Sequence, residues 1–506
     1  MQPLDLIIIF GYLIGVTLFG VWFAPKQETT EDYFVGDRSV PWWAIAASIV
    51  ATETSTITFI SVPGIAFAKG GNFQFLQLVF GYMLGRIVIS LLFIPMYFRG
   101  ELQTVYQLLG ERFGSKVKML ASALFVVMRN IADGIRLLLT AIVLAAVYVA
   151  FQPDADVNTV IIGSVFLLGA IMIVFTYYGG MEAVIWVEVV QLGIYIGGAI
   201  AAAFVILNQV DGGMPRVLEI GQQFNKFQLF DFTLDFTKTY TFWAGLIGGC
   251  FLTMSTHGTD QYLVQRYLCT NKSSRASLAL LSSGAVVLGQ FIGFLFIGVL
   301  LFAFYAPYNA AEYVSAGVAN SGITANFPFA GGDQVFPDFI TKHMPSGLSG
   351  LVVAAIFAAA LSSSLNSIAA TFVNDLYKPF KPAADDRHFL RVSHWLTLAF
   401  GIVQIVVALA VMKQNRSALD QALSIASLFN GPVLGVFLVG AFIKRAGQTA
   451  ALIGMSASIL LMLYLKFFTP LAWTWYVLIG SLTTLLVASL ASFIFTAEAQ
   501  KHENVR

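Results

Sequence analysis

Two stretches of the sequence place polar side chains inside segments that are otherwise apolar. Residues 51–56 read ATETST and are followed by Pro63 and Gly64. Residues 252–263 read LTMSTHGTDQYL, with Gly258 in their middle. A regular helix facing lipid does not tolerate such residues. An interrupted helix that lines a cavity does, because its freed carbonyls and hydroxyls can bind a cation or a polar solute. Both stretches therefore predict binding chemistry.

A third stretch contributes three consecutive hydroxyls, on Ser362, Ser363 and Ser364, followed by Asn366 and Ser367. Tight helix packing would explain the alanines that precede the serines, but it does not need this many hydroxyls. Hard cations such as Na⁺ take several oxygen ligands. Carbonyls of an interrupted helix together with these hydroxyls would supply them.

Ionisable side chains inside membrane segments are costly, and they usually line a pathway or pair with one another. Arg129, Asp133 and Arg136 are spaced i, i+4, i+7 and so share one helix face. They form either a structural ion-pair ladder or a site where one arginine binds an anionic group. Other such residues are Glu53, Arg86, Glu188, His257 and Asp260. We expect His257 to bond to the backbone at a helix break.

The elements that must position these side chains are membrane helices. The 506 residues are 58% hydrophobic and 11% charged, whereas soluble domains carry about 25% charged residues. This composition excludes a soluble multi-domain enzyme. Lys and Arg number 28 against 27 Asp and Glu, so nothing indicates a nucleic-acid partner. The chain has two cysteines, Cys250 and Cys269, too few for a disulfide framework.

About 20 apolar residues cross a bilayer as a helix, and on this basis we predict thirteen spans, numbered zero to twelve. Their limits are 4–24, 42–68, 74–98, 116–150, 157–179, 181–208, 241–268, 275–305, 347–377, 388–412, 418–443, 449–468 and 473–496. Most Lys and Arg residues of the loops fall on one side, which predicts an outside N-terminus and a cytoplasmic C-terminus.

Two interrupted helices five spans apart are typical of an inverted-repeat transporter. We therefore expect one membrane transport domain over residues 1–506. Its five-helix repeats would be 41–208 and 241–443, with an extra helix and inside loop at 1–40 and two peripheral helices at 449–496. No GxxxxGK[ST], HExxH or GxSxG motif is present, so neither direct ATP use nor an enzyme is expected.

Four stretches resemble the sodium/solute symporter family, whose members include sodium-coupled transporters of glucose, proline, pantothenate, iodide and sialic acid. They are DYFVGDRSVPWW at 32–43, the segment 100–113 with Gly100-Glu101, Thr104, Tyr106 and Arg112-Phe113, GTDQYLVQR at 258–266, and SLNS at 364–367 with Asn374-Asp375. The resemblance implies an all-α polytopic protein with the LeuT-type 5+5 inverted repeat.

By this resemblance, the main sodium site takes the carbonyls of Ala51 and Thr54 and the hydroxyls of Ser362 and Ser363. The candidate substrate-binding residues are Ser55, Thr58, Gln77, Asp260 and either Arg129 or Arg136.

The sequence departs from the family pattern at two places. Span eight has one run of three serines where many members have two pairs, and it is shorter by about three residues. If the residues that this span lacks, relative to the family, would precede the serines, then Ala359 and Ala360 occupy the main sodium site instead. Members with an extra sodium site use an aspartate on span five, where this chain has Glu188. Glu188 and Ser364 are therefore a possible second cation or proton site.

The expected function is sodium-coupled symport of a small polar solute, a sugar, an amino acid or a small organic acid, by alternating access across the plasma (inner) membrane. Sodium, the solute and membrane lipid are the expected partners. No organic cofactor, nucleic acid or obligate protein partner is implied. One alternative is proton coupling through Glu188 or Glu53. Another is a solute sensor that does not transport.

Overall fold

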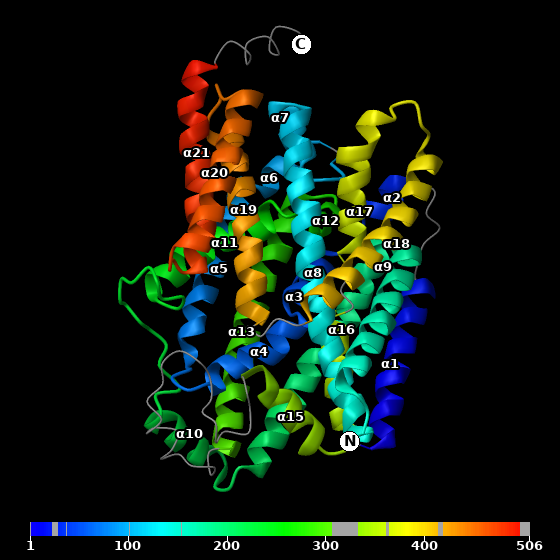
Figure 1. Cartoon of the computed structure of the whole chain (residues 1–506), viewed down its shortest axis with the longest axis vertical. Coiled ribbons are helices and arrows are strands. Elements are labelled where there is room, and N and C mark those ends of the chain that lie inside the picture. Colours follow the sequence, from blue (N-terminus) through cyan, green and yellow to red (C-terminus); the bar gives the residue numbers. More distant parts are fainter. Residues whose placement is uncertain are drawn as a thin grey trace.

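The computed structural model describes residues 2–22, 29–36, 38–100, 102–152, 154–305, 332–360, 364–412 and 418–495. These residues form a bundle of helices whose long members run roughly parallel to the vertical axis of Figure 1. The described part contains no strand, only an isolated bridge between Ser39 and Thr270. The start of α1 lies at one end of the bundle, and the end of α21 lies at the other (Figure 1).

The first half of the chain contains one interrupted helix and two very long ones. Its elements are α1 (Pro3–Trp22), α2 (Thr30–Val35), α3 (Trp42–Glu53), α4 (Thr56–Phe67), η1 (Phe73–Phe75), α5 (Leu76–Leu92), α6 (Ile94–Tyr97), α7 (Gln107–Phe113), α8 (Ser115–Phe151), α9 (Val157–Gln209) and α10 (Gly213–Gln223).

The second half repeats the interruption near its start. Its elements are η2 (Ala244–Gly248), α11 (Gly249–Gly258), α12 (Gln261–Leu268), α13 (Ser273–Tyr305), η3 (Gly332–Gln334), α15 (Val335–Lys342), α16 (Leu348–Ala360), α17 (Leu365–Thr371), η4 (Phe372–Tyr377), η5 (Lys378–Phe380), α18 (Asp386–Val411), α19 (Ala418–Phe442), α20 (Gln448–Phe468), η6 (Trp473–Trp475) and α21 (Tyr476–Ile494).

The element α9 covers two predicted spans, 157–179 and 181–208. The two join at Gly180, whose φ of 61° and ψ of −171° are not helical. A positive φ is readily adopted only by glycine, so this residue allows the chain to change direction between the two spans.

Small residues bring the helices that surround the interruptions close together. A side chain at Gly81 of α5 would clash with the carbonyl of Gly245 in η2, and one at Gly85 would clash with the carbonyl of Cys250 in α11. The glycines therefore let the backbone of α5 contact the backbone of the second interrupted helix. Behind these elements, α13 packs against α3, α4 and α5, while α8 packs against α9 and α18.

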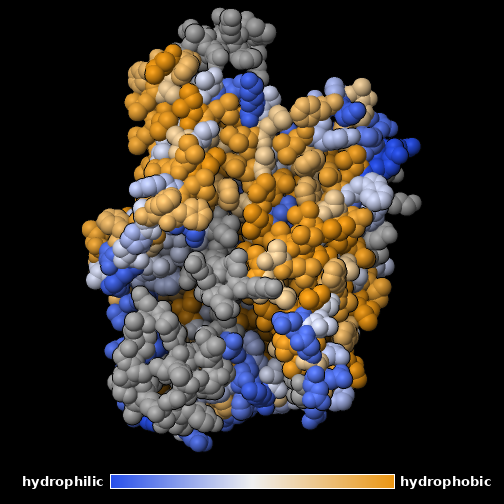
Figure 2. All heavy atoms as spheres, viewed as in Figure 1, coloured by the Kyte–Doolittle hydropathy of each residue, from blue (hydrophilic) through white to orange (hydrophobic). Residues whose placement is uncertain are grey.

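Apolar side chains cover much of the middle of the face in Figure 2, and hydrophilic ones gather mainly towards its ends. On α21, for example, Leu482, Leu486 and Leu490 are all exposed on one stripe. Such a surface suits lipid contact and would be a liability in water. Within the described residues, nine helices are long and apolar enough to cross a membrane, or ten if the bent pair α3–α4 is one span. The other three predicted segments, 241–268, 347–377 and 418–443, contain divided or shorter helices, so thirteen spans stays a prediction.

Candidate functional site

The first helix break lies where the ATETST stretch predicts it. α3 ends at Glu53, and Thr54 has a non-helical ψ of 74°. Ser55 then caps α4, with its Oγ accepting a hydrogen bond from the Thr58 amide at 3.5 Å. Ser and Thr compete with the helical backbone for hydrogen bonds and favour such caps. The two halves meet at an angle of 57°.

The second break lies in the LTMSTHGTDQYL stretch. α11 ends at Gly258, and Thr259 leaves the helical region with φ −135° and ψ −2°. Asp260 caps α12, its Oδ1 accepting from the Tyr262 amide at 2.8 Å. At both breaks, the helix that follows begins with a side-chain cap. This explains why short polar residues occur within these otherwise apolar segments.

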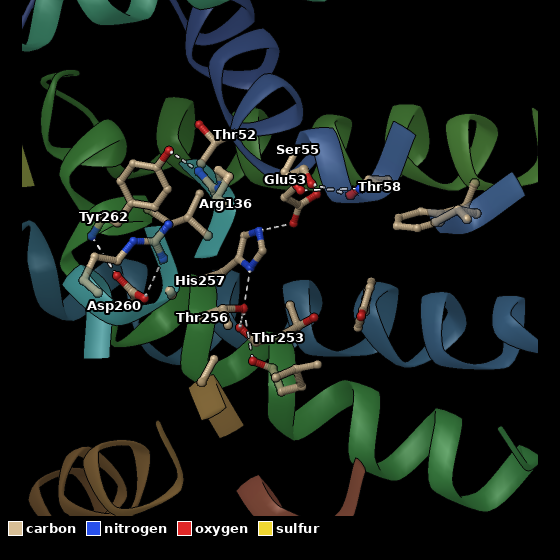
Figure 3. A pocket seen from close by; sticks show the side chains of 18 of the residues that line it. Thr52, Glu53, Ser55, Thr58, Arg136, Thr253, Thr256, His257, Asp260 and Tyr262 are labelled. Carbon is tan, nitrogen blue, oxygen red and sulfur yellow. Dashed lines mark hydrogen bonds and ion pairs between the residues drawn. The ribbon is translucent and has the colours of Figure 1, made fainter. Parts of the chain in front are cut away.

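A cavity of about 210 Å³ lies against both breaks. Figure 3 shows side chains of the two breaks pointing into it, among them Ser55, Thr58 and Asp260. The full lining is Thr52, Glu53, Ser55, Thr58, Val62, Phe75, Tyr82, Arg129, Ala132, Arg136, Leu252, Thr253, Thr256, His257, Asp260, Tyr262, Leu263, Phe291 and Ala426. Five of the six candidate substrate-binding residues line this cavity.

The sixth candidate, Gln77, is not among the lining residues. Its amide nitrogen donates to the carbonyls of Gln74 and Tyr240, and its Oε1 accepts from the Asp231 amide at 3.0 Å. Asp231 and Tyr240 belong to the segment between α10 and η2. In this conformation Gln77 holds that segment against the start of α5.

The two candidate arginines differ in how firmly they are held. Arg129 donates to both carboxylate oxygens of Asp133 at 3.1 and 3.3 Å, lies 3.6 Å from Asp260, and stacks over the Tyr262 ring at 3.9 Å. Arg136 approaches Asp133 at 3.6 Å and the Tyr262 hydroxyl at 3.5 Å. Arg129 is therefore built into an ion-pair cluster, and Arg136 is tied to it by long contacts.

The sodium-site candidates are only partly within the described residues. The Ala51 carbonyl accepts a hydrogen bond from the Tyr195 hydroxyl at 2.8 Å. The Thr54 hydroxyl lies 2.8 Å from both the Val50 carbonyl and Oε1 of Gln290. Ser362 and Ser363 lie outside the described residues, as do the side chains of Ala359 and Ala360.

The two residues of the possible second cation site have different partners. Glu188 forms an ion pair with Arg266 at 2.6 Å and accepts hydrogen bonds from Ser48 and Thr52. Ser364 instead donates to Asp133. Glu188 is thus a carboxylate that receives an ion pair and two hydrogen bonds. Ser364 gives its hydrogen bond to a different carboxylate, that of Asp133.

Sequence reasoning noted Glu53, Arg86 and His257 as separate residues and missed their contact. Nη2 of Arg86 lies 2.5 and 2.6 Å from the two Glu53 oxygens, and Nε2 of His257 contacts Oε1 of the same carboxylate. Nδ1 of His257 lies 3.0 Å from the Thr256 hydroxyl. His257 therefore bonds to side chains, in contrast to the expected backbone contact. The signal available in the sequence was the rarity of ionisable groups in apolar segments.

Comparisons with known proteins agree with this architecture. The model of the sodium:solute symporter family matches residues 33–457. The sodium/sialic acid symporter NanT of Aliivibrio fischeri is 32% identical over 498 residues, which cover 97% of this chain and 93% of that protein. SiaT of Proteus mirabilis, also a sodium/sialic acid symporter, is 30% identical over 509 residues, covering 97% and 95%.

A solved structure, the substrate-bound outward-open state of a Na⁺-coupled sialic acid symporter, has a TM-score of 0.83 at 28% identity and covers 98% of both chains. The prediction of an all-helical LeuT-type fold is confirmed. The protein is an integral, multi-pass membrane transporter that couples solute movement to Na⁺. The chain belongs to the sodium:solute symporter family.

Proposed function

We propose that this protein takes up a small hydroxylated carboxylate together with Na⁺ by alternating access, and that Arg136 binds the carboxylate. The observation that carries the proposal is the position of Arg136 on the cavity wall, where its side chain makes only long contacts, 3.5 and 3.6 Å, with the described residues. A guanidinium binds carboxylates through two parallel hydrogen bonds. Arg136 can make these bonds at little cost to existing ones.

Arg129 suits this role less well, although it lines the same cavity. It would have to give up two hydrogen bonds to Asp133 and its stacking over Tyr262. Breaking a buried ion pair leaves a charge uncompensated, which costs about 3–5 kcal/mol. We therefore assign Arg129 to holding α8 against Asp260 and Arg136 to substrate.

The rest of the cavity supports a hydroxylated solute. Its wall offers the hydroxyls of Ser55, Thr58, Thr253 and Thr256, and two tyrosines, Tyr82 and Tyr262. Hydroxyls both donate and accept, so they pair well with sugar-like groups. The relatives named as sodium/sialic acid symporters point to the same chemistry.

For sodium we propose the carbonyls of Ala51 and Thr54 with the hydroxyls of Ser362 and Ser363. Ala51 and Thr54 flank the first helix break, where carbonyls lose their helical partners. The ion would then tie the break to the segment after α16, beside the solute. Binding of the ion can shift the transport equilibrium only by its different affinities for the two states.

We further propose that the repeats 41–208 and 241–443 form the transport core, with the N-terminus outside and the C-terminus in the cytoplasm. The start of α1 and the end of α21 lie at opposite ends of the bundle, in keeping with an odd number of spans (Figure 1). The Lys and Arg bias of the loops supports this direction.

The test is thermal unfolding of the purified protein in detergent, in sodium, potassium or choline chloride at equal ionic strength. Each salt is combined with N-acetylneuraminate, gluconate, glucose or proline. A ligand that binds only the folded state stabilises it by about 2.7 kcal/mol at a hundredfold excess over its Kd. We expect a carboxylate of the sugar-acid type to raise the melting temperature in sodium only. Stabilisation by glucose or proline without any effect of either acid would overturn the proposed substrate class.

A further inference from the structure

The carboxylate of Glu53 lines the cavity next to His257 (Figure 3). Glu53 is the last residue of α3, and His257 is the penultimate residue of α11, so their contact joins the two helix breaks. Arg86, from the middle of α5, completes the group through both carboxylate oxygens. The cavity wall thus carries both an arginine, Arg136, and a glutamate, Glu53.

Only part of this group meets the cavity. Glu53 and His257 line it, and Arg86 does not. The Glu53 side chain is 15% exposed and that of Arg86 only 1%. An ionised carboxylate is a pure acceptor with about four lone-pair directions. Three contacts, two from one nitrogen of Arg86 and one from His257, leave acceptor capacity on Glu53 for a donor in the cavity.

Arg86 determines which kind of donor suits Glu53. It balances the charge of Glu53, so the pair is already neutral. Nε and Nη1 of Arg86 have no hydrogen-bond partner among the described residues, so the carboxylate is its main contact there. A solute ammonium at Glu53 would bring a second positive charge into a buried site with nothing to balance it, which is costly. A hydroxyl or amide N–H donates a hydrogen bond and adds no charge.

We infer that Glu53 is a specificity-determining residue of the transport site, which accepts a hydrogen bond from an uncharged donor of the solute, and that Arg86 excludes solutes with an ammonium group there. The inference rests on the proposed function, because the solute's carboxylate must be held by Arg136 while Glu53 receives another group of the solute. It separates hydroxylated carboxylates from carboxylates that carry an ammonium group remote from the acid, such as ω-amino acids.

The test uses full-length protein in detergent with saturating NaCl. The probes are linear carboxylates of four to eight carbons that end in a hydroxyl, an ammonium or a methyl group, and their Kd values are measured by calorimetry. For the chain length that fits, we expect the hydroxyl probe to bind about tenfold to hundredfold more tightly than the methyl probe, the range for a hydrogen bond to a charged group. The ammonium probe should be the weakest.

Two variants test the roles of the pair. Arg86→Gln leaves Glu53 unbalanced and should make the ammonium probe the tightest, whereas Arg86→Lys keeps the charge and should keep the hydroxyl preference. Glu53→Gln alone would strand the guanidinium of Arg86, so it is combined with Arg86→Gln. That double variant should discriminate less than threefold between hydroxyl and methyl probes.

An unchanged order of the three probes in Arg86→Gln, or a wild-type preference for the ammonium probe, would overturn the inference. Failure of every carboxylate to bind the wild type would instead overturn the proposed function, and this inference with it. A structural role for the ion pair would lower stability without reversing the order of the probes.

Discussion

The guanidinium of Arg266 lies 2.6 Å from the carboxylate of Glu188, and both side chains are almost fully buried. Arg266 belongs to α12 and Glu188 to α9, and the same carboxylate accepts hydrogen bonds from Ser48 and Thr52 of α3. One half of each interrupted helix is thereby fixed to the same point of α9. This relationship ties both breaks to a long helix outside them.

Replacing Glu188 by Gln should destabilise the protein by about 3–5 kcal/mol, because Arg266 would remain as a buried charge without its balancing partner. Thermal unfolding in detergent measures the loss. The matched control is Glu219→Gln, which breaks the exposed Arg216–Glu219 pair on α10 and should cost under about 1 kcal/mol. Equal melting temperatures for the two variants would show that the buried pair contributes no more than the exposed one.

The same variant tests proton coupling through Glu188. A glutamine imitates a protonated carboxylate, so a chain that is driven by protons through Glu188 would lose its response to a pH gradient. In the structure the carboxylate of Glu188 is already engaged by the ion pair with Arg266 and by hydrogen bonds from Ser48 and Thr52. We therefore expect sodium-driven uptake per folded molecule, measured in proteoliposomes, to persist in Glu188→Gln.

The sequence predicts the two helix breaks well because their cause is local. Polar residues that cap helices follow one another at 54–56 and 259–260, and nothing distant is needed to interpret them. The composition likewise predicts a membrane protein. The limits of the predicted spans 157–179 and 181–208 also leave out Gly180, the residue at which α9 changes direction.

The partners of the buried charges are not local, and a single sequence does not reveal them. Glu53 and Arg86 are 33 positions apart, and Glu53 and His257 lie on the two different interrupted helices. Their contact depends on how α3, α5 and α11 pack. Gln77 shows the converse: the family resemblance implies a substrate contact there, and in the structure its amide is engaged by backbone groups of another segment.

Replacing Arg136 by Gln should raise the Kd for the proposed carboxylate substrate by about tenfold to hundredfold, because a hydrogen-bonded charge pair is lost. The Kd of Arg136→Lys should fall between those of the wild type and Arg136→Gln, since an ammonium keeps the charge but cannot form the two parallel hydrogen bonds. Calorimetry with NaCl present measures both. Arg129→Gln is the control: it should chiefly lower the melting temperature, because Asp133 and Asp260 lose their partner. Greater loss of affinity in Arg129→Gln than in Arg136→Gln would reverse the assignment of the two arginines.

Ser362→Ala should weaken the binding of sodium to the protein, because it removes one proposed oxygen ligand. The measurement is the sodium concentration that gives half of the maximal thermal stabilisation. Ser364→Ala is the matched control: its hydroxyl donates to Asp133, so its loss should cost about 1–3 kcal/mol of stability and leave the sodium dependence unchanged. A sodium effect confined to Ser364→Ala would mean that the serines belong to the second site, with Ala359 and Ala360 at the main one.

Lys226 lies between α10 and η2, outside the predicted spans. Its fully buried Nζ donates to the carbonyls of Ala66, Phe67 and Ala68 at 3.0, 3.0 and 2.7 Å, at the C-terminal end of α4. Burial lowers the pKa of Lys226 to about 7. The unfolded chain, with an ordinary lysine pKa of about 10.4, therefore binds more protons than the folded one between these two values.

Stability rises with pH wherever the unfolded state holds more protons, by at most about 1.4 kcal/mol per pH unit for one group. Relative to Lys226→Met, the wild type should thus gain stability from about pH 7 to pH 10, while below pH 7 the difference between them should stay constant. Other titrating groups are common to both proteins and cancel. Melting temperatures of the two proteins in detergent at half-unit pH steps give this difference. A difference that is flat from pH 7 to 10 would mean that the amine of Lys226 titrates as in the unfolded chain, and that the three carbonyls of α4 compensate fully for its burial.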